Sequence, residues 1–223
     1  MACGRSGVRA PLGPLFMKKN KIIIFDFDGV IVNTCQLSIE INKEIFEDLD
    51  FSEIQDWAEG NVFEKKFRDG YTGDHENYYY QHYSQRIKSL EPVLGMKGVF
   101  EEMKKMGYKL AVVSSSFSDV IEKFLKDNGL DEYFVEIMGK DVSPSKVAKF
   151  KMIFEKHNIK AKETLIVTDS VGDVKEAKEV KMKTIGVTWG IHEKERLERA
   201  KADFIAENVE EIIVGMKELL ALN

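Results

Sequence analysis

Apolar residues occur along the chain in short, nearly continuous runs, each followed closely by polar residues. The main runs cover residues 21–25, 109–113, 164–167 and 183–188. An apolar run of this length without polar alternation is typical of a strand that is buried on both faces of a parallel sheet. We therefore predict four buried parallel strands.

Helical patterns separate these runs. Phe100, Met103 and Met106 recur on one helical face before Gly107, and further helical segments cover residues 174–182 and 209–220. Two more helices are predicted to begin at Ser118 and Ser145, because a serine at the N-cap can accept a hydrogen bond from a free backbone N–H. Strands that alternate with helices predict an α/β fold with a doubly wound parallel sheet.

Residues 34–91 depart from this rhythm. The segment has helical periodicity, many charged residues and a cluster of tyrosines at positions 78–80 and 83, but no convincing strand. It lies between the first predicted strand and the helix that leads to the second. We predict a helical insert that covers the edge of the sheet, with Pro92 and Gly95 at its return to the core.

Composition narrows the class of protein. With 223 residues, 43% hydrophobic and 32% charged, the chain is long enough for one globular α/β domain with an insert, or for two small domains. Its 33 basic and 38 acidic residues are well mixed and give a net charge of −5, which does not favour a nucleic-acid partner.

Several further expectations concern location and the N-terminus. Cys3 and Cys35 have neither metal-site nor disulfide spacing, and no apolar run is long enough to cross a bilayer. We expect a cytoplasmic protein without a membrane partner, present as a monomer or homodimer. Residues 1–16 differ in composition from the rest, and the sequence from Met17 reads like a natural start. We therefore expect residues 1–16 to be a disordered extension or a tail without a functional role.

Residues that can carry chemistry follow three of the predicted strands. Asp26 and Asp28 leave the first strand, Ser114 follows the second, and the segment 169–173, with an aspartate at each end, follows the third. Lys146 precedes a predicted helix. Each of these residues alone fits a turn, a helix cap or a solvated surface. Because the carboxyl ends of parallel strands share one edge of a sheet, we expect them to converge.

Together these groups suit one kind of reaction. Carboxylates are the oxygen ligands that Mg²⁺ prefers, while a hydroxyl group and a lysine can hold phosphate oxygens. A carboxylate can also attack phosphorus and form an aspartyl-phosphate. The sequence therefore predicts magnesium-dependent phosphoryl transfer.

The order of these motifs resembles that of the haloacid dehalogenase superfamily. The resemblance extends over residues 20–220, and the segments 186–190 (Gly-Val-Thr-Trp-Gly) and 202–204 (Ala-Asp-Phe) are similar to the branch of phosphoglycolate phosphatases and β-phosphoglucomutases. It implies a Rossmann-like core and a helical cap inserted after the first strand. The core would comprise residues 17–33 and 92–223, and the cap residues 34–91.

The resemblance also implies roles for individual residues. Asp26 would be the nucleophile, and Asp28 the general acid and then the general base. The implied metal ligands are Asp26, Asp28 (through its carbonyl), Asp169 and Asp173. The implied phosphate-binding residues are Ser114, Ser115 and Lys146, of which Ser114 and Lys146 would also take part in catalysis.

Some positions depart from the family's pattern. Thr168 stands where this branch usually has glycine, Asn33 where an acidic residue is common, and the segment around Lys146 lacks the usual Lys-Pro pair. Thr168 adds a side chain close to the expected metal site. These departures bear on the subfamily more than on the chemistry.

We expect a phosphatase that acts on a small phosphorylated metabolite, and three other functions remain open. A phosphomutase of the β-phosphoglucomutase type would use the same core residues, and the fold could also serve as a non-catalytic binding protein. A dehalogenase needs neither a proton donor at Asp28 nor a metal, so the acidic motifs argue against it. The sequence leaves the substrate undecided. The polar candidates in the cap are Lys65, Arg68, His75 and His82, although a solvated surface position suits each of them better.

Overall fold

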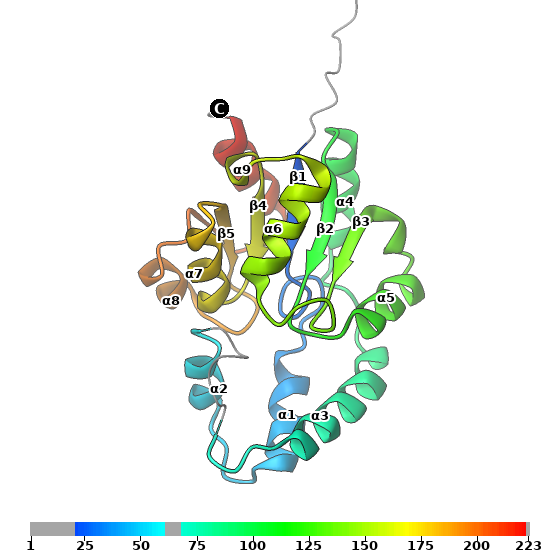
Figure 1. Ribbon diagram of the computed structural model, residues 1–223, viewed down its shortest axis with the longest axis vertical. Helices are drawn as coiled ribbons and strands as arrows, with labels where there is room; N and C mark the ends of the chain where they lie inside the picture. The colour runs from blue at the N-terminus through cyan, green and yellow to red at the C-terminus, as the bar shows by residue number, and fades with distance from the viewer. Residues whose placement is uncertain (1–20, 61–67, 222–223) are drawn as a thin grey trace, which may run out of the picture.

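The computed structural model describes residues 21–60 and 68–221, so the predicted extension 1–16 and Lys65 lie outside the described residues. The described chain forms a six-stranded sheet in the order β3-β2-β1-β4-β5-β6, and every neighbouring pair is parallel. This is the strand order of the doubly wound Rossmann fold. The prediction of a doubly wound parallel α/β sheet is confirmed (Figure 1). The strands are β1 (Ile22–Phe25), β2 (Lys109–Val113), β3 (Phe134–Met138), β4 (Leu165–Thr168), β5 (Lys183–Val187) and β6 (Phe204–Ala206).

The four predicted strands are β1, β2, β4 and β5, and the two edge strands were not predicted. β3 has Glu136 at its centre and a half-exposed Val135, so it lacks a continuous apolar run. β6 has only three residues. An edge strand has a neighbour on one side only, and its sequence therefore need not be apolar throughout.

Helices cover both faces of the sheet. Alternate residues of β1 point to opposite faces: Ile23 and Phe25 belong to one apolar cluster, Ile22 and Ile24 to the other. The first face is covered by α4 (Met96–Lys105), α5 (Ser118–Asp127) and α9 (Val209–Ala221), and the second by α6 (Lys146–His157) and α7 (Val171–Glu179). The short α8 (Lys194–Arg199) contacts α7 and β5. Single 3-10 turns occur at Ile87–Ser89, Asp131–Tyr133 and Ala161–Glu163.

Two of the predicted helix starts need correction. Ser145 caps α6 as predicted, since its side chain accepts a hydrogen bond from Ala148 N. Ser118 is instead the first residue of α5, and its hydroxyl accepts a hydrogen bond from Gly139 N at 2.9 Å, which ties α5 to the end of β3. α7 begins at Val171, three residues before the predicted 174, because Ser170 caps it by accepting a hydrogen bond from Gly172 N.

The described part of the segment 34–91 forms three α-helices, α1 (Cys35–Ile45), α2 (Phe51–Trp57) and α3 (Gly73–Arg86), and no strand of the sheet. They lie beyond the ends toward which the strands of the sheet point (Figure 1). The chain segments that lead into and out of these helices pair with each other, since Val93 N donates to Ile31 O at 2.8 Å and Val32 bridges Pro92. No helix in the described part of the chain has the length and apolar character needed to span a membrane.

Candidate active site

The neighbouring central strands β1 and β4 are each followed directly by an aspartate. Asp26 is the residue after β1, and Asp169 is the residue after β4. Asp26 N donates to Val167 O at 2.9 Å, which extends the pairing of the two strands by one residue. The order of the strands changes direction between β1 and β4, and in doubly wound sheets this switch point is where ligands bind.

Lys146 joins two of the predicted site residues. Its ammonium group lies 2.8 Å from Asp26 Oδ2 and 2.6 Å from Asp173 Oδ2. Each of the three residues is at most 6% exposed. Burial opposes the charge of Lys146, yet the two carboxylates hold its pKa above the ordinary value. Lys146 is therefore a permanent cation beside Asp26.

Three buried carboxyl groups lie near the single ammonium group of Lys146. Burial raises the pKa of Asp26 well above its ordinary value despite Lys146, and Asp173 and Asp169 add to the rise. Burial also raises the pKa of Asp169 to about 7, although a hydrogen bond from Ile191 N opposes this. Burial acts to raise the pKa of Asp173, but the charge of Lys146 and the hydrogen bonds that Asp173 makes with Asp26, Lys146 and Thr168 together lower it. If all three carboxylates were ionised, one ammonium group would not balance their charge, and a further cation would stabilise them.

The donor set fits a hard divalent cation. As they stand, no three acidic, histidine or cysteine side chains of the described residues converge on one point, and Asp26 and Asp173 turn toward Lys146. Mg²⁺ does not need such a cluster, because it keeps several waters and usually takes one or two carboxylates from the protein. Asp26 and Asp169, at adjacent strand ends, supply two.

Two glycines make space for Asp169. A Cβ atom added to Gly29 or to Gly190 would overlap the Asp169 carboxylate. Gly29 also has a φ of +70°, which disfavours other residues. Both backbone segments can therefore lie against this carboxylate only because the residues are glycines.

Asp28 has a different environment from Asp26. Its Oδ1 accepts hydrogen bonds from Thr34 Oγ1 at 2.8 Å and from the Tyr83 hydroxyl. Its Oδ2 accepts from Ser116 Oγ at 2.7 Å and from Ser114 Oγ at 3.4 Å. Thr34 and Tyr83 belong to the segment 34–91, whereas the serines follow β2. Two carboxylates in such unlike surroundings can take different roles in acid–base chemistry.

The loop after β2 is fixed by a lysine that the sequence analysis missed. Lys149 is fully buried on the inward face of α6 and donates to Ser114 O at 2.6 Å and to Gly139 O at 3.3 Å. Burial, together with the charge of Lys146, lowers the pKa of Lys149 to about 8. Ser114 is buried, and its hydroxyl accepts a hydrogen bond from Ser116 N at 2.9 Å. A polar residue among the apolar positions of a helix was the only signal for Lys149 in the sequence.

Thr168 contacts the site directly. Its hydroxyl donates to Asp173 Oδ2 at 2.7 Å and accepts from Ser170 N at 3.1 Å. We expect Thr168→Val to lower the free energy of unfolding by about 1.5–3 kcal/mol, the usual contribution of a hydrogen bond to a charged group. Urea unfolding measures this, and Thr168→Ser, which keeps the hydroxyl, should lose less. Equal stability of the valine variant and the wild type would show that this hydrogen bond contributes little.

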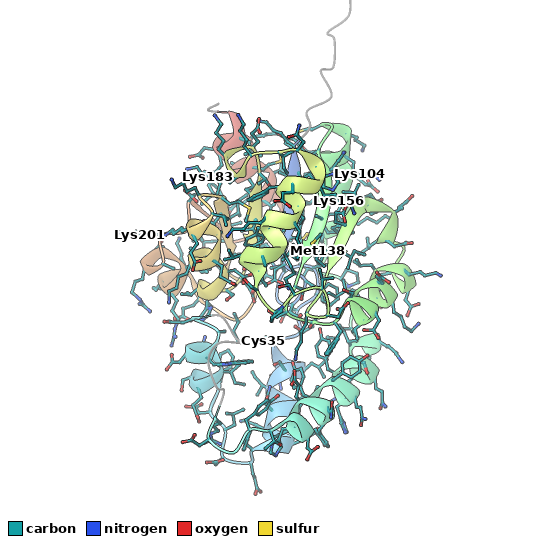
Figure 2. All side chains as sticks on the ribbon, in the orientation of Figure 1. Cys35, Lys104, Met138, Lys156, Lys183 and Lys201 are labelled. Carbon is teal, nitrogen blue, oxygen red and sulfur yellow. The ribbon has the colours of Figure 1, made fainter. Side chains whose placement is uncertain are left out.

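A cavity of about 410 Å³ extends from these residues toward α1, α2 and α3. Its lining includes Asp26, Asp28 and Lys146 at one end, as well as Ser115. Cys35 also lines the cavity. It is the first residue of α1 and lies near the junction between the sheet and these helices (Figure 2). A cavity of this size suits a small-molecule ligand.

The described polar candidates of the segment 34–91 do not line this cavity. Arg68 pairs with Asp48 at 2.7 Å and with Glu53 at 3.2 Å. His75 accepts a hydrogen bond from Thr72 N, and the ring of His82 stacks on an exposed tyrosine. All three residues are half-buried and contact other residues of the insert, so the prediction of fully solvated positions is only partly met.

Comparisons with known proteins agree with this arrangement. The sequence profile of the haloacid dehalogenase-like hydrolases matches residues 23–187. A phosphoglycolate phosphatase from Vibrio parahaemolyticus is 29% identical over 138 residues, which are 60% of this chain and 60% of that protein. The chain therefore matches less than two thirds of the length of that relative. The pyrophosphatase PpaX from Listeria monocytogenes is 25% identical over 88% of this chain and 96% of its own length.

A solved structure shares the fold. A hydrolase of the haloacid dehalogenase-like family from Streptococcus pneumoniae superposes with a TM-score of 0.72 at 18% identity. The match covers 89% of this chain and 99% of the other.

Proposed function

The chain belongs to the haloacid dehalogenase-like hydrolases, and on this basis we propose that it is a magnesium-dependent phosphatase. It would hydrolyse a small phosphorylated metabolite through an aspartyl-phosphate intermediate on Asp26. The observation that carries the proposal is the buried ion pair of Asp26 with Lys146 at the end of a ligand-sized cavity. The two curated relatives, a phosphoglycolate phosphatase and a pyrophosphatase by name, also support it.

Two contacts hold the carboxylate of Asp26, the proposed nucleophile. Its Oδ1 accepts a hydrogen bond from Phe27 N at 2.7 Å, and its Oδ2 faces Lys146. A carboxylate oxygen attacks phosphorus, a new P–O bond forms, and the bond from phosphorus to the leaving oxygen breaks. Lys146 offsets the negative charge of the phosphoryl group, which would otherwise repel the carboxylate.

Asp28 moves the protons. In its protonated form it donates a proton to the leaving oxygen, so that an alcohol departs. It then accepts a proton from the water that attacks the aspartyl-phosphate, and this step returns Asp26 and releases inorganic phosphate. The hydrogen bonds from Thr34 and Ser116 keep the Asp28 carboxyl group in place between the core and α1.

The metal would be held by the carboxylates of Asp26 and Asp169 and by the carbonyl of Asp28, with Asp173 as a ligand or as a partner of one. When bound, Mg²⁺ would supply positive charge to the phosphoryl oxygens. Asp173 would then position Lys146, to which it is hydrogen-bonded. Ser114 would bind the phosphoryl group through its hydroxyl, which in this structure lies 3.4 Å from Asp28 Oδ2.

Residues 34–91 would form a cap over a core of residues 17–33 and 92–223. Contacts between this cap and the segment 169–173 support the proposal: Ala58 O accepts hydrogen bonds from Gly172 N at 3.1 Å and from Ser170 Oγ at 2.9 Å. Rotation of the cap about its two paired connections would admit the substrate and then exclude water, a common gating device.

Removal of the metal tests the cofactor. We expect the protein treated with EDTA and then freed of chelator to lose nearly all phosphatase activity, because the positive charge that would offset both the carboxylates and the phosphoryl group is then missing. Addition of Mg²⁺ should restore the activity, whereas addition of Na⁺ at equal ionic strength should not. Full turnover of the metal-free protein in EDTA would refute the metal's role.

A further inference from the structure

The part of the cavity next to the insert has a wall of aromatic rings. The insert contributes Trp57, Tyr71, Tyr79, Tyr80 and Tyr83, and the core contributes Phe117.

Three of the tyrosine hydroxyl groups already donate to protein acceptors. Tyr79 donates to Ser38 Oγ at 3.0 Å, Tyr80 to Asp119 at 2.8 Å, and Tyr83 to Asp28. These hydrogen bonds fix the rings at one end, so the rings offer the cavity mainly carbon surface. Tyr79 and Tyr83 are also nearly parallel, at 14° with 5.7 Å between their centres.

The charges of the described residues that line this part of the cavity balance each other. The catalytic centre and its neighbour Glu176 are set aside here. Of the other described residues that line the cavity, only Glu76 and Lys140 carry charge, and they form an ion pair with each other. The other polar lining groups there include Ser38 and Asn42, which are neutral. A carboxylate or a second phosphate that entered this space would lose its hydration, and the nearest cation already has an anionic partner.

We propose that this space selects phosphomonoesters whose leaving alcohol is uncharged and carries a planar ring, either an aryl ring or a nucleobase. The inference rests on the proposed phosphatase function and deepens it by naming the class of substrate. The rings of Tyr79 and Tyr80 pack against the planar group of the substrate, while its phosphoryl group reaches Asp26.

A panel of substrates tests the proposal on the magnesium-loaded protein. Benzyl phosphate and adenosine 5′-monophosphate represent the aryl and nucleobase sources of a ring, ethyl phosphate is neutral without a ring, and phosphoglycolate and pyrophosphate have charged leaving groups. We expect kcat/KM for at least one of the two ring-bearing esters to exceed that for each of the other three by about tenfold or more, as one or two ring contacts would give.

A matched pair of variants tests whether the aromatic wall of the cavity causes the preference for ring-bearing esters. Tyr80→Leu removes a ring that lines the cavity and packs edge-on against Phe117. The adjacent Tyr78 is exposed, stacks on His82 and does not line the cavity, so Tyr78→Leu is the control. Tyr80→Leu should raise KM for the preferred ring-bearing ester several-fold and leave KM for ethyl phosphate unchanged, while Tyr78→Leu should change neither.

The possible failures are distinguishable. Preference for phosphoglycolate or pyrophosphate, or equal kcat/KM for the ring-bearing esters and ethyl phosphate, would overturn the inference and leave the phosphatase function standing. An equal effect of Tyr80→Leu on all esters would also overturn it, since the ring would then have only a structural role. Absence of turnover with every compound would refute the proposed function, and the inference with it.

Discussion

Asp26→Asn should reduce kcat by at least about 10⁴-fold, by comparison with removal of other enzymatic nucleophiles. The amide is nearly the same size as the carboxylate but is a poor nucleophile. The fold should persist. Burial and the neighbours Asp173 and Asp169 raise the pKa of Asp26, which means that the folded protein disfavours a charge at this position and should tolerate a neutral amide. The measurement is steady-state turnover of an alkyl phosphate, together with urea unfolding of the same preparation.

Asp127→Asn is a suitable control for this variant. Asp127 is an exposed residue near the end of α5 and pairs with Lys123. The same change of chemistry there should leave both turnover and stability close to those of the wild type. Substantial turnover by well-folded Asp26→Asn protein would rule out Asp26 as the nucleophile.

Asp28→Ala should slow both half-reactions with an alkyl phosphate, by about 10²- to 10⁴-fold if general acid–base catalysis has its usual size. With p-nitrophenyl phosphate the leaving group needs little protonation, so the first step should suffer less than the second. The expected result is a burst of p-nitrophenol close to one equivalent per enzyme, followed by slow turnover. Stopped-flow absorbance measures both phases.

The alanine variant also leaves the hydroxyls of Thr34, Tyr83 and Ser116 without their acceptor. Asp28→Asn keeps the shape of the side chain and one acceptor, so it separates loss of the proton carrier from local rearrangement. Both variants should show slow hydrolysis of the phosphoenzyme. If Asp28→Ala turned over an alkyl phosphate at the wild-type rate, Asp28 would not be the acid and base, and a dehalogenase-like or non-catalytic function would regain support.

The central strands could be predicted because the burial of each strand is visible in its own short run of residues. Strands buried on both faces must be apolar throughout, as Ile22–Phe25 and Lys109–Val113 nearly are. The position of Asp26 and Asp169 at the same edge of the sheet then follows from the parallel pairing of β1 with β4. The edge strand with Glu136 at its centre gave no such signal, since the lower burial of that strand permits polar residues.

The contacts around Asp28 could not be predicted in the same way. Tyr83 reaches Asp28 from a segment 55 residues further along the chain, and this contact depends on how α3 lies against the core. Thr168 stood out only as a departure from a family pattern, and its hydrogen bond to Asp173 needs the turn between β4 and α7 to be known. The roles of the site residues stay predictions until they are tested.

Identification of the phosphorylated residue tests the central claim most directly. Asp28→Ala protein is mixed with p-nitrophenyl phosphate and Mg²⁺, quenched in acid within the burst, digested and mapped by mass spectrometry. We predict one phosphoryl group on the peptide that contains Asp26, at a yield that matches the burst, and none in the Asp26→Asn/Asp28→Ala double variant. A phosphoryl group on any other residue, or a burst without phosphorylated protein, would contradict covalent catalysis by Asp26.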